Sequence, residues 1–206
     1  MGPMGNLNMC EETGRPNDKM LQYFYARAKG GVGLLTTGLI PISHGIDNSV
    51  TEPNNLSYFP RIDGTRTNYM GWRDLAQGCH AFGSKIFIQL TPGLGRVGNP
   101  QCVIVSKKFP VSSSNNPNFY ISEIPSFRLS GGKLNKIIKN SGQAAADAEE
   151  CGLDGVYLHV DLCQYFGQKF RFFWWVPATL DKPFINALKF SPEGDKLKAS
   201  YNISPS

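Results

Sequence analysis

The stretch VGLLTTG, residues 32–38, is a nearly continuous run of apolar and small residues. A strand that is buried on both faces carries such a run, because neither of its faces needs polar residues. KIFIQL at residues 85–90 and DGVYLH at residues 154–159 are two further strand candidates. The short apolar segment at residues 1–5 can join them only if another part of the chain pairs with it.

Helical patterns separate these strand candidates. Residues 18–29 place apolar side chains four apart, and Asn17 or Asp18 can cap that helix. A second pattern covers residues 69–82, and a third runs through residues 134–148. Strands that alternate with helices form a parallel sheet, so the sequence predicts the α/β class. Long connections follow the strands, and such loops are where α/β proteins place function.

Composition excludes several classes of protein. The chain has 206 residues, 41% of them hydrophobic and 18% charged, which is typical of a folded globular protein. We find no run of roughly 18 apolar residues for a membrane span and no secretory signal. Five cysteines are scattered without a Cys-x-x-Cys pair, so we expect reduced thiols, a cytoplasmic location and no iron–sulfur cluster. A net charge of +5 without a basic cluster does not favour nucleic acid.

Polar residues at two strand ends are candidates for a site. Gln89 lies near the end of one predicted strand, and its amide can bond either loop backbone or the edge of a flat heteroaromatic ligand. His159 ends the last predicted strand, where parallel sheets open onto their sites. The other two histidines, His44 and His80, are expected in a solvated loop and at the polar edge of a helix.

The segment GLGRVG, residues 93–98, fits the pattern G-x-G-x-x-G. That pattern holds a pyrophosphate only where a helix begins within it, and the prolines at positions 92 and 100 oppose such a start. We therefore interpret it as a glycine-rich active-site loop, with a nucleotide-binding module as the alternative. The chain has no G-x-S-x-G segment, so a hydrolase triad lacks support.

Four ordered segments carry a family resemblance: MGPMGN, YFYARAKGGVGLLTTG, GWRDLAQGCHAFGSKIFIQLTPGLGR and AAADAEECGLDGVYLH. They resemble the old yellow enzyme family of flavin oxidoreductases, in the branch of the enoate and bile-acid-inducible reductases. The resemblance implies a TIM barrel that holds FMN at the carboxyl ends of its strands. It also implies NAD(P)H as the reductant and an activated alkene, an enone or enoate, as the acceptor.

The resemblance also implies roles for individual residues. The residues that would contact FMN are Pro3, Met4, Gly5, Gly38 and Gln89. His159 would be the first member of a pair that polarises the substrate carbonyl, and Tyr165 would supply a proton. The sequence departs from the family three residues after His159, where Leu162 cannot donate a hydrogen bond.

The resemblance covers residues 1–159, which form the N-terminal half of such a barrel with about four βα units. Residues 160–206 form a divergent tail that contains the aromatic run FRFFWWVP at residues 170–177. Three hypotheses follow. The chain is an FMN-dependent oxidoreductase, a truncated and non-catalytic half-barrel, or a nucleotide-binding module. In the second case it binds flavin weakly or acts within a homo-oligomer or beside a complementing subunit. No membrane or nucleic-acid partner is expected.

Overall fold

The computed structural model describes residues 1–6, 8–42, 46–47, 59–98, 103, 108–112 and 114–159, and the backbone of residues 174–177. Its helices are α1 (Asp18–Lys29), α2 (Arg66–Ala81) and α4 (Gly131–Glu150), with one 3-10 turn, η1 (Gly95–Val97). The strands of the main sheet are β1 (Leu34–Pro41), β2 (Lys85–Thr91), β6 (Gly155–Leu158) and β7 (Trp174–Pro177). Three short strands are β3 (Val111–Ser112), β4 (Asn116–Pro117) and β5 (Pro125–Arg128).

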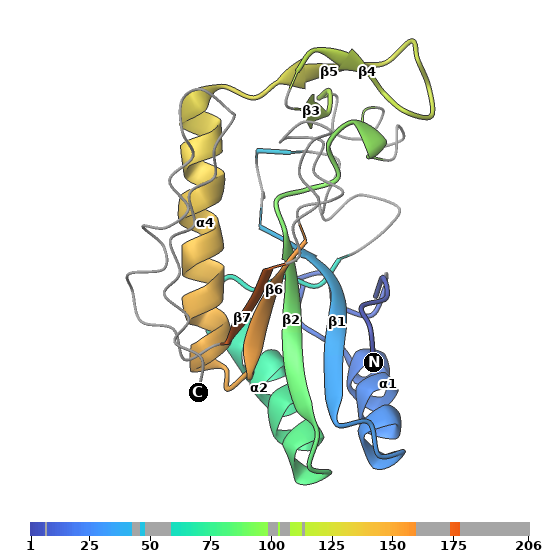
Figure 1. Cartoon of the computed structure of the whole chain (residues 1–206), viewed down its shortest axis with the longest axis vertical. Coiled ribbons are helices and arrows are strands. Elements are labelled where there is room, and N and C mark those ends of the chain that lie inside the picture. The colour runs from blue at the N-terminus through green and yellow to red at the C-terminus, as the bar shows by residue number, and fades with distance from the viewer. Residues whose placement is uncertain are drawn as a thin grey trace, which may run out of the picture.

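The main sheet has the strand order β1-β2-β6-β7, and its first three strands are parallel (Figure 1). This confirms the parallel sheet that the alternation of strands and helices predicts. Because the three strands run in one direction, their carboxyl ends meet at one edge of the sheet. The polar residues that follow these strands are therefore brought together there.

Side-chain caps fix where the helices begin. The Asn17 side chain accepts a hydrogen bond from the amide of Met20, so Asn17 is the cap of α1 among the two candidates, Asn17 and Asp18. Thr65 caps α2 in the same way, so that helix begins at Arg66 and not at the expected residue 69. The first turn of α2 carries few apolar residues, so the apolar spacing in the sequence placed the start of the helix too late.

The core lies between the helices and one face of the sheet. Alternate residues of the three parallel strands join this core, namely Leu35, Ile40, Ile86, Ile88, Leu90, Val156 and Leu158. The side chains between them turn to the opposite face. On that face the ring of Phe87 lies over Gly155, where a Cβ atom would come within 2.7 Å of the ring. The two residues are direct neighbours in the β2–β6 ladder.

The N-terminal segment, residues 1–6, lies along the outer edge of β1. The Met1 nitrogen donates to the carbonyl of Leu34, and the amide of Thr36 donates to the carbonyl of Met1 over 3.2 Å. The segment pairs with β1 but does not form the regular strand that the sequence allowed at residues 1–5. The sequence allowed this segment to join the sheet only if another part of the chain pairs with it, and β1 provides that pairing.

The connection between β2 and α4 contains a second small sheet, with the order β3-β5-β4. It lies beyond the carboxyl ends of β1, β2 and β6, at the upper end of Figure 1. The sequence predicted only a long polar connection here. Strands of two to four residues leave too short a period to detect.

The strand β7 belongs to the predicted tail and pairs antiparallel with β6, with Leu158 opposite Trp174 and Gly155 opposite Pro177. In a (β/α) barrel the neighbour on this edge would be another parallel strand. The tail therefore departs from the barrel pattern at its one described element.

Candidate active site

Gln89 and His159 lie together at the carboxyl ends of β2 and β6. The side-chain Nε2 of Gln89 is 3.3 Å from Nδ1 of His159. The amide of His159 donates to the carbonyl of Leu90 over 2.8 Å, which continues the β2–β6 ladder one residue past the strand and fixes the position of His159. Gln89 is only 3% exposed, so its amide needs polar partners. The structure thus brings together the two residues that the sequence singled out.

The direction of this hydrogen bond has a consequence for the imidazole. An amide nitrogen can only donate, so Nδ1 of His159 accepts. A neutral ring with an accepting Nδ1 carries its proton on Nε2. The Gln89 side-chain amide has a second N–H and a carbonyl oxygen, and these two groups can hydrogen-bond to a flat heteroaromatic ligand.

Gly38 lies where the N-terminal segment crosses β1. A Cβ atom built on Gly38 would be 1.9 Å from the carbonyl oxygen of Met4, so only glycine fits at this position. Pro3, Met4 and Gly5, in the same segment, are exposed. The close approach of the Met4 backbone is thus what requires glycine at position 38.

Asn6 is a buried residue of this crossing that sequence reasoning missed. Its side-chain oxygen accepts a hydrogen bond from the amide of Gly38 over 2.6 Å, and only 2% of the residue is exposed. A single asparagine after an apolar segment resembles an ordinary turn residue, so the sequence carries no signal for this role.

Tyr157 was also missed. It is the direct neighbour of Gln89 in the β2–β6 ladder, and its ring centroid lies 6.4 Å from that of His159. Gln89, Tyr157 and His159 therefore occupy one face of the sheet. The signal was present in the sequence, because Tyr157 and His159 are two residues apart on one predicted strand.

The glycine-rich loop, residues 93–98, lies at the same end of the sheet. It contains the 3-10 turn η1, and the amide of Gly95 donates to a carboxylate oxygen of Asp47 over 3.0 Å. That carboxylate bonds an amide that a pyrophosphate would use, and its negative charge repels phosphate. This geometry argues against the nucleotide-binding alternative.

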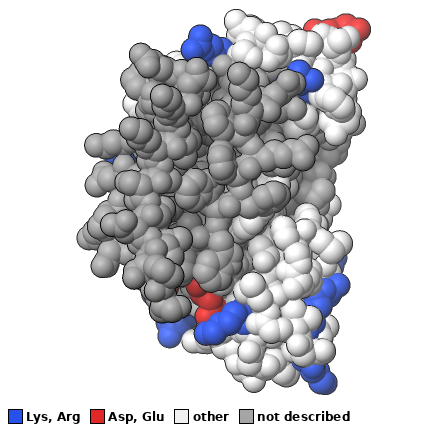
Figure 2. Space-filling view, in the orientation of Figure 1, with Lys and Arg blue, Asp and Glu red and all other residues white. Residues whose placement is uncertain are grey.

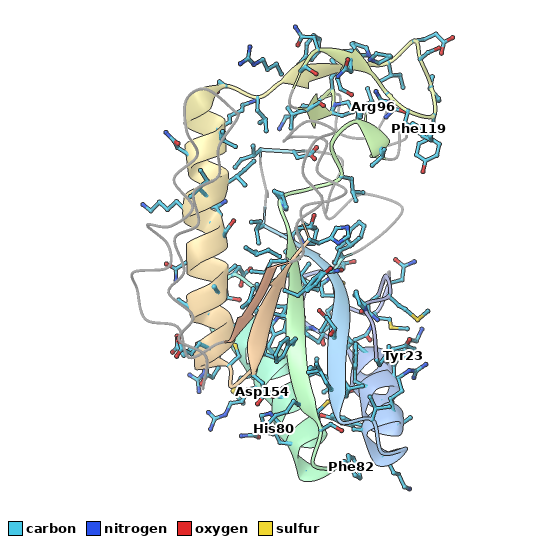
Figure 3. All side chains as sticks on the ribbon, viewed as in Figure 1. Tyr23, His80, Phe82, Arg96, Phe119 and Asp154 are labelled. Atoms are coloured by element: carbon cyan, nitrogen blue, oxygen red, sulfur yellow. The ribbon has the colours of Figure 1, made fainter. Side chains whose placement is uncertain are left out.

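The small sheet holds the other side of this loop. Asn118 Nδ2 donates to the carbonyl of Gly98 over 3.0 Å, and the amide of Phe119 donates to the carbonyl of Arg96 over 2.9 Å. The Arg96 guanidinium lies 5.8 Å from the centre of the Phe119 ring, and Figure 3 shows the two side chains at the upper end of the molecule. The loop is thus held by Asp47 and by the residues that follow β4.

A polar cluster occupies the opposite end of the sheet. His80 Nε2 lies 2.6 Å from Asp154, and Lys85 Nζ lies 2.8 Å from the same carboxylate (Figure 3). The amide of Ile86 donates to this carboxylate as well, over 2.9 Å. His80 therefore pairs with Asp154 at the end of the sheet opposite Gln89 and His159. His44, Leu162 and Tyr165 lie outside the described residues.

The described cysteines are buried, and this bears on their reactivity. Burial raises the pKa of the Cys10 and Cys79 thiols to about 11 and that of Cys151 to about 12. These thiols are therefore protonated at neutral pH and are poor nucleophiles. Within the described ranges, the structure holds no group of three or more acidic, histidine or cysteine side chains arranged for a metal ion.

The distribution of surface charge is mixed where it can be seen. On the face shown in Figure 2, lysine and arginine side chains are separated at the upper and lower ends of the molecule. None of the helices in the described part of the chain is both long and apolar enough to cross a membrane.

The family model for the NADH:flavin oxidoreductase / NADH oxidase family matches residues 1–170. The chain belongs to this family. The match extends past His159, the end of the expected resemblance, and spans the seven residues whose roles the resemblance implies. The division of the chain at residue 159 stays a prediction.

Two curated relatives of this flavin oxidoreductase family are similar in sequence. One is the cinnamate reductase of Clostridium sporogenes, which is 29% identical over 159 residues. The other is the NADH oxidase of Thermoanaerobacter brockii, which is 31% identical over 160 residues. Each alignment covers 77% of this chain but only 23% of the relative. The chain thus spans about a quarter of the length of these relatives.

Solved structures of old yellow enzymes share the fold. The homologue from Zymomonas mobilis aligns with a TM-score of 0.58 and 20% identity, over 77% of this chain and 43% of its own. The old yellow enzyme of Pichia sp. AKU4542 gives a TM-score of 0.60 at 21% identity, over 74% of this chain and 39% of its own. The arc of parallel strands and helices is therefore a part of the old yellow enzyme fold.

The residues at the strand ends fit the flavin that defines this family. A flavin presents a planar pyrimidine edge with alternating donors and acceptors, and the buried Gln89 amide offers both kinds of group. Pro3, Met4 and Gly5 are exposed residues of the N-terminal segment that pairs with β1. FMN is thus the cofactor whose chemistry these groups suit.

Proposed function

We propose that this chain binds FMN at the carboxyl ends of β1, β2 and β6 and acts as an NAD(P)H-dependent reductase of activated alkenes. The observation that carries the proposal is the contact of 3.3 Å between Gln89 and His159. It brings a donor–acceptor amide for the flavin and an imidazole for the substrate to one point. Bound FMN would accept a hydride from NAD(P)H and deliver it to the acceptor.

Gln89 is the residue that we assign to the pyrimidine edge of the flavin. It is buried, and its backbone is fixed in the middle of the sheet, so its amide loses little freedom when a ligand binds. Gly38 and the backbone of Pro3, Met4 and Gly5 would form the adjacent wall. These contacts orient the cofactor without charge.

His159 is the residue that we assign to the substrate carbonyl. With Nδ1 occupied by Gln89, its Nε2–H is the group that can donate to a carbonyl oxygen. Such a donor stabilises the enolate-like negative charge that develops on that oxygen during reduction. Tyr165 is the proposed proton donor to the reduced alkene carbon. The enone or enoate acceptor and the choice between NADH and NADPH belong to this proposal as well.

A titration of the purified chain with FMN tests the first half of the proposal. Binding should quench flavin fluorescence and shift the visible absorption bands, and Gln89→Leu should weaken it. The second half is tested by NADH oxidation with cyclohexenone or cinnamate as the acceptor. His159→Ala should lower the rate of alkene reduction and leave the affinity for FMN within about twofold. A wild-type chain that binds no FMN would refute the proposal.

A second candidate is favoured by the pairing of β7. This strand runs antiparallel along the edge of β6, where a complete barrel continues with a parallel strand. In this case the chain is a non-catalytic half-barrel that binds flavin weakly, or that acts in a homo-oligomer or beside a complementing subunit. Sedimentation velocity with and without FMN gives the oligomeric state, and the alkene-reduction assay gives the activity. A compact monomer that reduces an alkene excludes the second candidate.

A further inference from the structure

The strand β1 contains one residue more than its neighbour β2 at the level of the site. Thr36 pairs with Phe87, and the next pair in the register is Leu39 with Gln89. Two residues of β1, Thr37 and Gly38, therefore lie opposite a single residue of β2. Such a bulge leaves backbone groups of the two strands without their regular ladder partners.

The hydroxyl group of Thr37 replaces one of these ladder partners. Its Oγ1 accepts a hydrogen bond from the backbone amide of Gln89 over 3.0 Å and donates to the carbonyl of Gly38 over 2.9 Å. Thr37 is fully buried, with 0% of its surface exposed. A buried amide without an acceptor is costly, so this hydroxyl determines where the backbone of Gln89 can lie.

The bulge is held on its other side by the N-terminal segment. The amide of Gly38 donates to Asn6 Oδ1 over 2.6 Å. A continuous path of contacts therefore runs from Asn6 through Gly38 and Thr37 to Gln89, and from the Gln89 side chain to His159. The path links the N-terminal segment, β1 and β2, which carry the proposed flavin contacts, to His159 after β6, which is proposed to bind the substrate.

We infer that Thr37 is a positioning residue, whose hydroxyl group sets the location of the Gln89 amide relative to His159 and to the flavin. Thr37 acts through Gln89 and does not itself contact the cofactor. The inference rests on the proposed function for its effect on flavin. Its effect on Gln89 and His159 can be measured without any ligand.

The test compares four variants of the full chain. Thr37→Ser keeps the hydroxyl group, Thr37→Val keeps the shape without it, and Thr37→Ala removes both. Thr36→Val is the matched control, because it makes the same change on the preceding residue, whose hydroxyl makes no hydrogen bond to Gln89. If Thr37→Val fails to fold, the comparison of Thr37→Ala with Thr37→Ser still isolates the hydroxyl group.

The ligand-free measurements are amide hydrogen exchange at Gln89 and the NMR contact between the Gln89 side-chain amide protons and the His159 ring. Thr37→Val and Thr37→Ala should speed exchange at Gln89 about tenfold or more and weaken that contact. Thr37→Ser and Thr36→Val should retain wild-type behaviour at both. A general loss of stability would instead speed exchange at all core amides together, and that result would overturn the inference.

The flavin measurements are the affinity for FMN and the visible absorption maximum of bound FMN. Thr37→Val should weaken binding about tenfold and move the maximum, while Thr37→Ser keeps both at the wild-type values. If the wild-type chain binds no FMN, the proposed function fails, and the ligand-free measurements still decide the role of Thr37. Unchanged exchange and an unchanged Gln89–His159 contact in Thr37→Val overturn the inference, whatever the flavin result.

Discussion

The side-chain amide of Gln89 lies 3.3 Å from the imidazole of His159, although the two residues are 70 positions apart in the chain. The contact exists because β2 and β6 are parallel neighbours that end at the same level, with Gln89 paired to Tyr157. Strand pairing therefore assembles this site without help from the loops. Variants of Gln89 test the assembly directly.

Replacing Gln89 by leucine should reduce the affinity for FMN by about tenfold or more, because the pyrimidine edge loses both a donor and an acceptor. Gln89→Glu keeps the shape but turns the donor into a negatively charged acceptor, and it should bind even less well. Fluorescence titration with FMN measures both effects. Gln143→Leu is a matched control, since this glutamine bonds Asp147 within α4. Equal losses in the Gln89 and Gln143 variants would contradict the assignment.

The fold was largely predictable from its periodic segments. The sequence predicted α1 with a cap at Asn17 or Asp18, and it predicted the parallel strands, because buried strands and capped helices have strong local signals. Gln89 and His159 could be selected from the sequence as candidates because both are polar groups at the ends of apolar strands, and the structure places their side chains in contact.

Other features depend on contacts between distant segments and left no local signal. The bulge at Thr37 depends on the pairing of β1 with β2, and the role of Asn6 depends on the crossing at Gly38. The pattern TTG reads equally well as an unbroken strand. The short strands β3, β4 and β5 have too few residues for a period. Tertiary pairing decides such details, and a single sequence does not record it.

Gly38→Ala should displace the N-terminal segment, since its Cβ atom would lie 1.9 Å from the Met4 carbonyl oxygen. A backbone atom cannot rotate away, so either the segment or the strand must shift, at a cost of about 1–3 kcal/mol. Hydrogen exchange should quicken at Thr36 and Gly38, whose amides bond Met1 and Asn6.

The control for this variant is Gly33→Ala, because a Cβ atom at Gly33 meets nothing within 4 Å. It should leave the stability unchanged or raise it slightly, by limiting the freedom of the unfolded chain. Similar melting temperatures for Gly38→Ala and Gly33→Ala would contradict this prediction, because they would show that the N-terminal segment can shift away from β1 at little cost in free energy.

Gly155→Ala tests the packing of the sheet face that carries the site. The added Cβ atom would lie 2.7 Å from the Phe87 ring, so the variant should lose about 1–3 kcal/mol of unfolding free energy. Phe87→Leu shortens the opposing side chain and should recover part of that loss in the double variant. Urea denaturation of the wild type, both single variants and the double variant gives the coupling energy. If the changes in unfolding free energy of the two single variants simply add in the double variant, the residues at positions 155 and 87 are not in steric conflict.

The carboxylate of Asp154 should make the stability of the chain depend on acid pH. Burial raises the pKa of this group, but hydrogen bonds from Lys85, His80 and the amide of Ile86 outweigh burial and hold the pKa below its ordinary value. A carboxyl group with a lowered pKa in the folded state stabilises the protein above its unfolded-state pKa. That contribution is lost as pH falls through the folded-state value.

Asp154→Asn should therefore lower the free energy of unfolding at pH 7 by about 1–2 kcal/mol, with the share from exposed Lys85 reduced by solvent screening. The difference from the wild type should shrink as pH falls below about 4, because the wild-type carboxyl group then becomes protonated as well. Urea denaturation at several pH values measures this, and Glu123→Gln, at an exposed position, serves as the control. A difference that is independent of pH would show that Asp154 stabilises the β2–β6 end of the sheet through its shape and neutral hydrogen bonds, and not through its charge.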